Sequence, residues 1–443
     1  MTTGPFAFNP LASPHLENPY PLYARAQREA PIFFSPLFAT WVVTRYEDVR
    51  AILHDPRRFS SSYLFRTPVD PTPEVLAVLA HLPPEVGVLV NEDPPGHRRT
   101  RAMVGKAFMP KQVARMEARI RAIAHELIDH MLEAGCADLV RQYTYPLPMR
   151  VLLEFLGLPV EDADFIKQWC NDHMLLSVPG IGAAQQLRSA QTEVAFSRYT
   201  EALIAARQHQ PQADVLSALI HAQVEGEQPL DVVELHALVQ QLLFAGHETT
   251  TNLLSNTCYA LLRDPTQWHA LHHDLTLSTR VVEEGLRYDA PVQGMFRTTT
   301  EDVEMHGVTL PAGARVFVVF GAANRDERIF AHPHRFDLWR PNADQHLAFG
   351  HGIHHCLGAA FVRLEARIAL EVLVQRLPDV QLVPAQTITY LPSLLNRALQ
   401  HLQVRWTASL PVNPYKETHH ATRWLSPLYA RSALRGQHDA RDR

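Results

Sequence analysis

The sequence predicts a mainly α-helical protein with small β-sheets, folded as one large domain. Three observations support this fold class. Apolar residues recur at helical spacing through several long segments, the longest uninterrupted helical signal covers residues 231–264, and short runs rich in β-branched residues appear late in the chain. No internal repeat or linker-like stretch interrupts residues 20–405.

Composition excludes several classes of protein. The chain has 443 residues, of which 46% are hydrophobic and 20% are charged, and its formal net charge is −5. These values exclude a disordered chain, a collagen-like chain and a polybasic nucleic-acid binder. The first residues carry no basic segment followed by an apolar core, and no run of 18 apolar residues is present. We therefore expect a cytoplasmic protein without a membrane span.

The expected elements follow from the periodicity of apolar residues. They are a strand at 41–44, helices at 46–54, 111–135, 161–176, 184–208, 214–223 and 231–264, and strands at 308–310, 316–320, 380–383 and 403–406. Residues 62–90 mix Pro, Leu and Val without a clean period, so we expect a long loop with an apolar side.

The long helix at 231–264 is weakened at its centre. Asp231 and Glu234 make a plausible capping box at its start. The centre contains Gly246 and three consecutive threonines at 249–251, and these residue types are poor helix formers. Threonine hydroxyls can also bond back to the preceding turn. We expect that another group approaches the helix closely there.

The sharpest chemical signal is the run of residues 349–358, which reads Phe-Gly-His-Gly-Ile-His-His-Cys-Leu-Gly. A helical pattern begins directly after Cys356, and a cysteine at a helix N-terminus is favoured as thiolate. Such a thiolate could be a nucleophile, a zinc ligand or an axial haem ligand, and a buried structural cysteine is the plain alternative. No second Cys or His cluster is placed to complete a zinc site.

This run resembles the haem-binding loop of the cytochrome P450 family, whose pattern is Phe-Gly-x-Gly-x-His-x-Cys-x-Gly. Every fixed position matches. The resemblance implies the cytochrome P450 fold, a triangular, α-rich single domain with a long central helix above the haem. It also implies that Cys356 ligates the iron. The residues that it places beside the haem in this loop are Phe349, Gly350, His354, Leu357 and Gly358.

The centre of the long helix resembles the oxygen-activating motif of the same family. Glu248 and Thr249 form its acid–alcohol pair, which would relay the protons that cleavage of dioxygen requires. Small residues at Ala245 and Gly246 would leave room beside the haem. The competing zinc-protease motif HExxH fails, because residue 251 is Thr rather than His.

Two further motifs have counterparts in the family. The pair Glu284 and Arg287, with Arg335 from a later Pro-x-Arg-Phe segment, is expected to form a structural triad. His97 and Arg101, which lie four residues apart, are expected to bind the haem propionates. Arg297 and His354 occupy the other two positions that bind the haem propionates in the family.

Family position also implies a substrate pocket and a docking surface. The expected pocket residues are Phe244, Ala245, Gln293, Met295 and Leu394, roofed by the loop 62–90 and the helix near 174–178. Apolar residues with one amide suit an apolar or aromatic substrate. A basic surface for an acidic redox partner is expected from Arg98, Arg99, Lys106, Lys111 and Arg115.

The resemblance implies a monooxygenase that inserts one oxygen atom from O2 into a small apolar or aromatic molecule by hydroxylation, epoxidation or O-dealkylation. The implied cofactor is haem b, with electrons ultimately from NAD(P)H through a ferredoxin or a flavin/iron–sulfur reductase, separate or formerly fused. Neither nucleic acid nor a membrane is an expected partner. The alternatives are a natural-product hydroxylase of a bulkier substrate, a peroxide-driven haem enzyme, and a non-enzymatic haem sensor or carrier.

Several segments are similar to the haem domains of bacterial self-sufficient members of the family, which are fused to a reductase. They include the sequence that begins at Trp41 and the sequence that leads into residue 97. The haem domain is expected to span residues 1–406. Residues 407–443 are then a basic tail, a remnant linker or a disordered extension.

Overall fold

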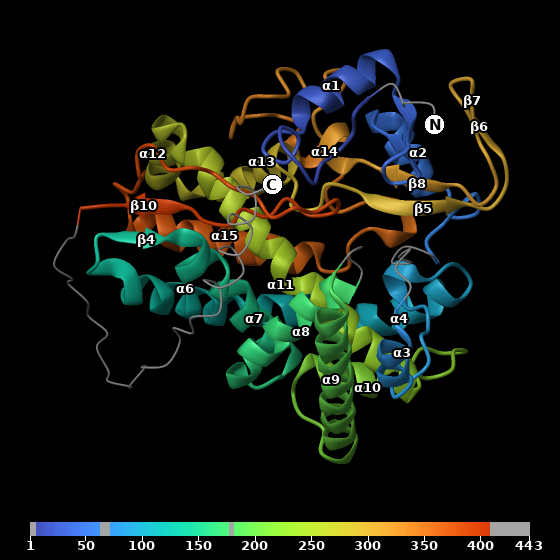
Figure 1. Cartoon of the computed structure of the whole chain (residues 1–443). Coiled ribbons are helices and arrows are strands. Elements are labelled where there is room, and N and C mark those ends of the chain that lie inside the picture. The colour runs from blue at the N-terminus through green and yellow to red at the C-terminus, as the bar shows by residue number, and fades with distance from the viewer. Residues whose placement is uncertain (1–5, 63–70, 177–180, 408–443) are drawn as a thin grey trace, which may run out of the picture. The chain divides into compact units, whose positions relative to one another are not determined.

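The computed structural model describes residues 6–62, 71–176 and 181–407 (Figure 1). Helices dominate this part of the chain. The α-helices are α1 (Tyr20–Glu29), α2 (Tyr46–His54), α3 (Pro73–Leu79), α4 (Gly96–Ala107), α5 (Pro110–Arg115), α6 (Glu117–Leu132), α7 (Pro146–Leu156), α8 (Ala163–Leu176), α9 (Ala183–His209), α10 (Val215–Ile220), α11 (Val232–Leu262), α12 (Pro265–His273), α13 (Ser278–Tyr288), α14 (Phe320–Ala323) and α15 (Ala359–Arg376). Short helical turns are η1 (Leu89–Asn91), η2 (Val140–Thr144), η3 (Val160–Asp162), η4 (Leu275–Leu277), η5 (Ala343–Gln345) and η6 (Gly352–His354).

The strands form small sheets. They are β1 (Ile32–Ser35), β2 (Thr40–Val43), β3 (Phe59–Ser60), β4 (Cys136–Asp138), β5 (Met295–Thr299), β6 (Val303–Met305), β7 (Val308–Leu310), β8 (Arg315–Val318), β9 (Gln381–Leu382) and β10 (Gln403–Arg405). A five-stranded sheet has the order β1-β2-β8-β5-β3, a three-stranded sheet has the order β4-β10-β9, and β6 pairs with β7. In the larger sheet β2 runs parallel to β8, with Trp41 opposite Val316, and β5 runs antiparallel to β8.

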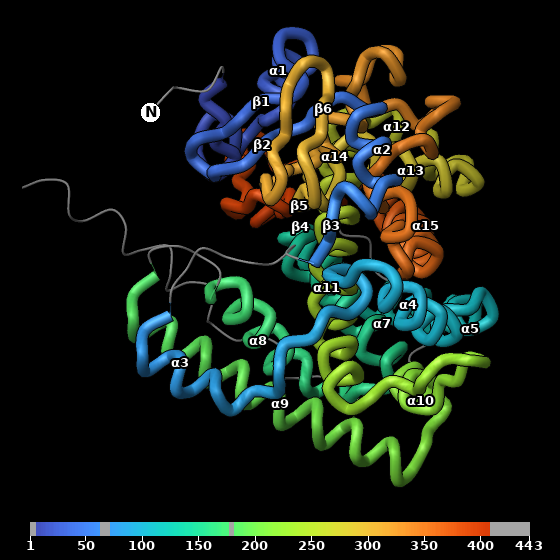
Figure 2. The backbone as a smooth tube through the Cα atoms, turned by 90° about the vertical axis from the view of Figure 1, so that its right-hand side faces the viewer, coloured from blue at the N-terminus to red at the C-terminus, as the bar shows by residue number. Residues whose placement is uncertain are grey.

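The central helix α11 separates two groups of elements. Figure 2 shows the five-stranded sheet with α1 and α2 on one side of α11, and α8, α9 and α10 on the other. Leu235, Leu243, Leu254 and Leu261 are all buried along α11 and join the largest hydrophobic core. A large apolar core of this kind is what allows a chain of this length to fold without disulfides.

The predicted capping box at the start of α11 is confirmed. The Glu234 N–H donates to Asp231 Oδ1 at 2.8 Å, and the Asp231 N–H donates to Glu234 Oε2 at 3.0 Å. The expected close approach at the centre of the helix comes from α7. A Cβ on Gly246 would lie 2.9 Å from both methyl carbons of Leu152, so the Leu152 side chain would have to shift to accept one. Gly246 therefore packs against α7, and its place beside the haem stays a prediction.

Most of the predicted elements agree with the structure within a few residues, but the loop predicted at 62–90 is only partly irregular. It contains α3, in which Thr72 Oγ1 accepts from the Val75 N–H at 3.4 Å and Pro73 occupies the first turn. Both are helix-start signals that the apolar pattern concealed. Residues 63–70 and 177–180, which belong to the predicted roof of the pocket, lie outside the described residues, as does the tail from residue 408.

The structural triad forms with a different arginine. Glu284 pairs with Arg287 at 2.7 Å and with Arg340 Nε at 3.1 Å, and all three side chains are buried. The prediction that Arg335 completes the triad is wrong. Arg335 is exposed and contributes its backbone carbonyl, which accepts from both Arg287 and Arg340. The Pro-x-Arg-Phe motif therefore contributes the backbone carbonyl of Arg335 to the network. The side chain of Arg340, five residues later, pairs with the Glu284 carboxylate.

Along the described part of the chain, no helix combines the length and the apolar character that crossing a bilayer requires.

Candidate active site

The cysteine loop is a closed turn that precedes α15. The Cys356 N–H donates to the Phe349 carbonyl at 2.8 Å, and Gly350 and Gly352 adopt φ values of 70° and 71°. A Cβ on Gly352 would also lie 2.5 Å from the Leu53 carbonyl oxygen of α2. Glycine is therefore required at this position by both conformation and space.

Opposing influences act on the Cys356 thiol. Burial raises its pKa above the ordinary value of a thiol, and the backbone N–H groups of Gly358 and Ala359 and the charges of Arg101 and Arg363 offset only part of that rise. The N–H groups point at sulfur from the first turn of α15, as expected for a cysteine at a helix N-terminus. A cation ligated by the sulfur would add the positive charge that a buried thiolate needs.

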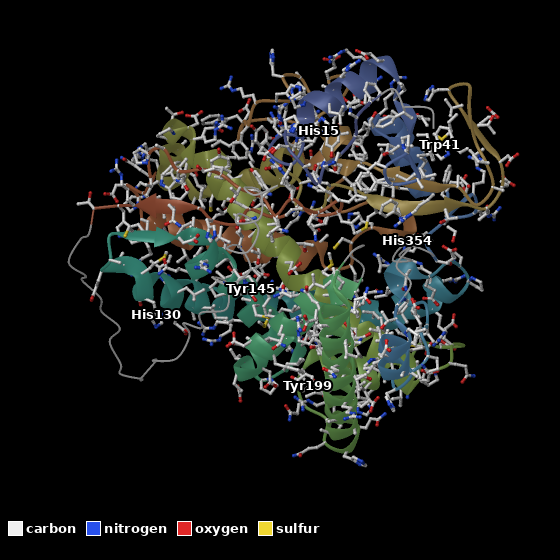
Figure 3. The ribbon with its side chains drawn as sticks, viewed as in Figure 1. His15, Trp41, His130, Tyr145, Tyr199 and His354 are labelled. Carbon is white, nitrogen blue, oxygen red and sulfur yellow. The ribbon has the colours of Figure 1, made fainter. Side chains whose placement is uncertain are left out.

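Four nitrogen-bearing side chains converge beside this loop. His97 and Arg101 come from α4, Arg297 from β5 and His354 from η6. The imidazole rings of His97 and His354 have centroids 4.3 Å apart. Figure 3 shows His354 between β5 and α4. The structure thus brings together the four residues that the sequence predicted as propionate ligands.

These groups lack the protein partners that buried cations and imidazoles ordinarily have. Among the described residues, His97 Nε2 and both ring nitrogens of His354 are buried without a hydrogen-bond partner, and the one bond found for Arg297 goes to the carbonyl of Phe296. Burial lowers the pKa of Arg297 to about 10, and burial with the charges of Arg297 and His97 lowers that of His354 to about 3. An anionic ligand would satisfy them all.

The unpartnered donors and the sulfur together fit haem. Thiolate sulfur is a known axial ligand of haem iron, and the two propionates of the macrocycle would supply the anions that the donors need. The residues that would hold the group are Cys356, His97, Arg101, Arg297 and His354.

A partly buried carboxylate organises the approach to α4. Asp93 accepts from the hydroxyls of Ser60 and Ser62 and from the Ser61 N–H, at 2.8 Å in the last two cases. These bonds outweigh the effect of burial and lower the pKa of Asp93. The segment before His97 is thereby fixed to β3.

The acid of the predicted acid–alcohol pair is ion-paired. Glu248 Oε1 lies 2.9 Å from Lys167 Nζ of α8, and Lys167 lies over the Tyr145 ring at 4.9 Å. Burial raises the pKa of Glu248, but Lys167 and His247 outweigh it, so the pKa is below its ordinary value. His247 is fully buried, and burial lowers its pKa to about 4. The carboxyl of Glu248 is therefore ionised at neutral pH beside an uncharged imidazole.

The alcohol lies one residue further along the same helix. Thr249 Oγ1 donates to the Ala245 carbonyl at 2.9 Å, and Thr250 Oγ1 donates to that of Gly246 at 3.2 Å. Ala245 is exposed and Thr249 is partly exposed, whereas Thr250 is buried. The Ala245–Thr249 face of α11 is thus accessible, while the Thr250 side faces the core.

The predicted pocket residues divide into two groups. Phe244, Met295 and Leu394 keep partly exposed side chains, and Met295 and Leu394 pack against one hydrophobic cluster together with Val90. Gln293 differs, because it is 4% exposed and its amide donates to the Ala290 carbonyl at 2.8 Å.

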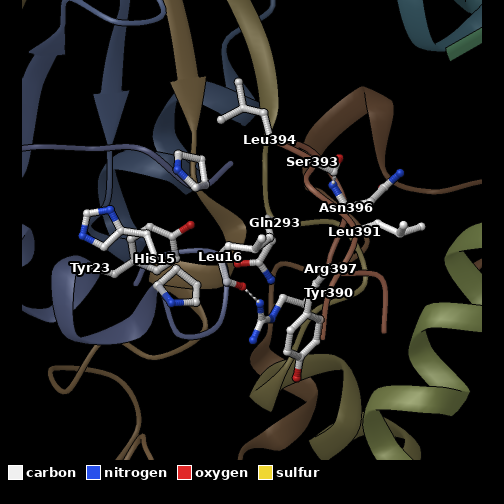
Figure 4. A pocket seen from close by; sticks show the side chains of 12 residues that line it. His15, Leu16, Tyr23, Gln293, Tyr390, Leu391, Ser393, Leu394, Asn396 and Arg397 are labelled. Carbon is white, nitrogen blue, oxygen red and sulfur yellow. Dashed lines mark hydrogen bonds between the residues drawn. The ribbon is translucent and has the colours of Figure 1, made fainter. Parts of the chain in front are cut away.

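Figure 4 shows where Gln293 lies. It lines a void of about 10 Å³ together with Leu16, Leu394 and Arg397, between the N-terminal segment and the chain near residue 394. A Cβ on Gly321 would lie 2.3 Å from Gln293 Oε1. Among the described residues, Gln293 Oε1 is buried without a hydrogen-bond partner, and the role of Gln293 as the polar group of the substrate pocket stays a prediction.

The predicted basic surface is partly engaged within the chain. Arg99 pairs with Glu234 and donates to the Gln228 carbonyl, and Lys106 donates to the Gln223 carbonyl. Arg98, Lys111 and Arg115 are exposed. Arg99 thus joins α4 to the start of α11 rather than projecting into solvent.

Comparisons with known proteins agree with this geometry. The sequence model of the cytochrome P450 family matches residues 181–389. Cytochrome P450 monooxygenase PikC of Streptomyces venezuelae is 39% identical over 397 residues, which are 88% of this chain and 91% of the relative. This chain belongs to the cytochrome P450 family. The mycinamicin IV hydroxylase/epoxidase of Micromonospora griseorubida is 38% identical over 371 residues, which are 83% of the P450 described here and 89% of that relative.

The fold of this P450 is also found among solved structures. An intact type IV self-sufficient cytochrome P450 monooxygenase superposes with a TM-score of 0.86 at 34% identity, covering 91% of this P450 and 53% of the larger chain. Members of the family are haem-dependent oxidoreductases, so the P450 is a monooxygenase that requires haem iron and a supply of electrons.

Two ion-pairing side chains of this P450, Lys167 and Arg340, were not predicted from the sequence. Lys167 gave no local signal, because its partner Glu248 lies 81 residues away and the pairing depends on how α8 crosses α11. Arg340 was available in the sequence five residues after Arg335, but only the fold decides which arginine reaches Glu284.

Proposed function

We propose that this P450 inserts one oxygen atom into an apolar or aromatic organic substrate, with Cys356 as the iron ligand and Glu248 and Thr249 as the proton-delivering pair. The observation that carries the proposal is the pairing of a partly buried, ionised Glu248 with a partly exposed Thr249 on adjacent residues of α11. A sensor or carrier needs no such pair, and the relatives named above are monooxygenases and hydroxylases.

The haem supplies oxygen activation when bound, and the chain supplies its protons. Glu248, held by Lys167, can accept a proton from the solvent side of α11 and pass it toward Thr249. The Thr249 hydroxyl, which donates to the Ala245 carbonyl, can exchange that bond for one to the reacting oxygen. The charges of Arg101 and Arg297 would balance the propionates, and the imidazoles of His97 and His354 would add hydrogen bonds that fix the orientation of the cofactor.

The substrate class rests on the predicted pocket residues and on Val90. Phe244, Met295, Leu394 and Val90 are all apolar, and Met295 can adapt to ligands of different shape. We favour a small aromatic substrate, as the similarity to self-sufficient enzymes suggests. A bulkier natural product is the alternative, since one relative is named for its action on mycinamicin IV.

Electrons are proposed to come from NAD(P)H through a ferredoxin or a flavin/iron–sulfur reductase, with Arg98, Lys111 and Arg115 available to an acidic partner. We also propose a cytoplasmic location, which is consistent with four cysteines that form no disulfide.

An absorbance titration of the ferric holoprotein tests the substrate class. Anisole serves as the small aromatic ether and mycinamicin IV as the bulky natural product. A blue shift of the Soret band with anisole alone supports the small-substrate proposal. A shift with mycinamicin IV alone overturns it in favour of the alternative.

Substitution of the alcohol tests the catalytic assignment. The assay contains the ligand that gives the larger Soret shift, a surrogate ferredoxin and ferredoxin reductase, and NADPH. In this assay Thr249→Ala should divert most electrons to hydrogen peroxide, while its haem content equals that of the wild type. Thr250→Ala is the matched control, since its hydroxyl makes the same type of bond on the buried side of the helix. Equal peroxide release by both variants and the wild type would remove Thr249 from the mechanism.

A further inference from the structure

One amide side chain of the central helix contacts the chain that leads into α4. Gln241 lies on α11, one helical turn before Ala245. Its Nε2 donates to the Val88 carbonyl at 3.0 Å and to Asn91 Oδ1 at 3.4 Å, and its Oε1 accepts from the Val90 N–H at 3.2 Å. Both donor directions and the acceptor of the Gln241 amide are therefore used by three residues of the segment 88–91.

The contacted segment, residues 88–91, has an unusual backbone. Leu89 adopts a φ of 44°, a left-handed conformation that is uncommon for a residue other than glycine. Within the segment, the Val88 N–H donates to Asn91 Oδ1 at 3.0 Å, and the Asn91 N–H donates to the Val88 carbonyl at 3.3 Å. Gln241 bonds to both of these groups, so it holds a turn that has a strained residue at its centre.

The same segment connects two hydrophobic clusters. Val88 and Leu89 are buried in the cluster that contains the central helix, whereas Val90 packs against the cluster that also receives Met295 and Leu394. The turn thus packs Val90 against the same hydrophobic cluster as two predicted pocket residues, Met295 and Leu394. A change in its position would alter the pocket on that side.

We propose that Gln241 is a positioning residue that fixes residues 88–91 as one wall of the substrate pocket and thereby controls the affinity of ligands that reach that wall. This inference rests on the proposed function, because it takes the space beside Val90, Met295 and Leu394 as the substrate pocket. Gln241 itself acts through the turn rather than on the reacting atoms.

Three variants separate this role from a general effect on the helix. Gln241→Leu removes all three bonds at similar side-chain volume. Gln241→Glu keeps an acceptor for the Val90 N–H but places a carboxylate oxygen against the Val88 carbonyl and Asn91 Oδ1, which are both acceptors. Gln240→Leu is the matched control, since it makes the same substitution on the neighbouring residue. Among the described residues, Gln240 makes no hydrogen bond with the turn.

Amide hydrogen exchange tests the contact without requiring haem. Loss of the bond from the Val90 N–H should speed exchange in a peptide that covers residues 88–91 by about tenfold in Gln241→Leu, by less in Gln241→Glu, which keeps that acceptor, and not in Gln240→Leu. Unchanged exchange in both Gln241 variants would overturn the proposed contact. A chain that binds no haem would instead overturn the proposed function, and the exchange result would still decide the role of Gln241.

Two azole ligands of the ferric holoprotein test the consequence for binding. Imidazole coordinates the iron without reaching the wall, whereas 4-phenylimidazole extends a ring into the pocket. The dissociation constant of 4-phenylimidazole should rise about fivefold or more in Gln241→Leu, as the loss of positioning bonds predicts, with that of imidazole changed less than about twofold. Equal changes for both ligands, or none, would overturn the role of Gln241 in the pocket.

Discussion

Lys167 Nζ of α8 lies 2.9 Å from Glu248 Oε1 of α11, so the acid of the acid–alcohol pair is tied to a helix on the far side of the central helix from the larger sheet. The side chains of Lys167 and Glu248 are 17% and 22% exposed. The ion pair keeps Glu248 charged in a place where burial would otherwise favour the neutral form.

A double-mutant cycle measures this pairing. Lys167→Met should lower the free energy of unfolding at pH 7 by about 2 kcal/mol, which is less than for a fully buried pair because both side chains touch solvent. In the background of Glu248→Gln the same substitution should cost much less. Equal costs in the two backgrounds, measured by urea denaturation, would show that Lys167 does not stabilise the charge of Glu248.

The pH dependence of that coupling has a definite sign. The folded-state pKa of Glu248 is lowered from 4.5, so its contribution to stability is fully present above pH 4.5 and is lost as the pH falls through the lowered value. The coupling energy between Lys167 and Glu248 should therefore be constant from pH 5 to pH 7 and decline in more acidic solution.

The corrected triad gives a comparison between two arginines. Arg340 donates to both oxygens of Glu284 and to three backbone carbonyls, so Arg340→Ala should destabilise the fold by about 3–5 kcal/mol or prevent folding. Arg335→Ala removes an exposed side chain and should change stability by less than about 0.5 kcal/mol. Thermal unfolding of the two variants decides between them, and a larger effect at Arg335 would restore the original prediction.

Haem retention should depend on Arg297 more than on a nearby arginine of the same sheet. Arg297→Leu removes a buried cation from the propionate site and should speed transfer of haem to apomyoglobin by about tenfold or more. Arg315→Leu is the control, because Arg315 on the paired strand β8 stacks on Phe296 at 3.7 Å. Equal rates for the two variants would argue against propionate binding by Arg297.

A buried acid on α15 should make stability depend on pH. Among the described residues, Glu365 Oε1 has no hydrogen-bond partner, and burial raises the pKa of this carboxyl to about 8. Because the folded-state pKa is above the unfolded value, the stabilising contribution is fully present below pH 4.5 and is lost as the pH rises toward and through 8.

Glu365→Gln should remove that dependence. The variant should match the wild type at pH 5 and be more stable by a few kcal/mol at pH 9, on the scale of about 1.4 kcal/mol for each unit of pKa shift. The measurement is the free energy of unfolding against pH. A parallel pair of curves would show that Glu365 has no abnormal titration.

Motifs that depend on local spacing could be predicted from the sequence. The capping box of α11, the glycine turns of residues 349–358 and the four donors beside Cys356 all follow from residues close in sequence or from a family pattern. The same is true of the long helix, whose observed range differs from the prediction by one or two residues at each end.

Contacts between distant segments could not be predicted in this way. Lys167 and Glu248, and Gln241 and Val90, meet only because helices and loops pack in one arrangement. Gly246 shows the same limit, because a small residue in a functional motif turned out to face Leu152 of α7. Residue type and spacing indicate chemistry, but the direction in which a side chain points depends on the packing around it.

Ligation of haem iron by the Cys356 thiolate is tested most directly by the absorption spectrum of the reduced, carbon monoxide-bound holoprotein, compared with that of Cys356→His. We expect the strongly red-shifted Soret band of a thiolate-ligated carbonyl complex in the wild type and its loss in Cys356→His. A wild-type spectrum without the red shift, or one that the substitution leaves unchanged, would contradict this ligation.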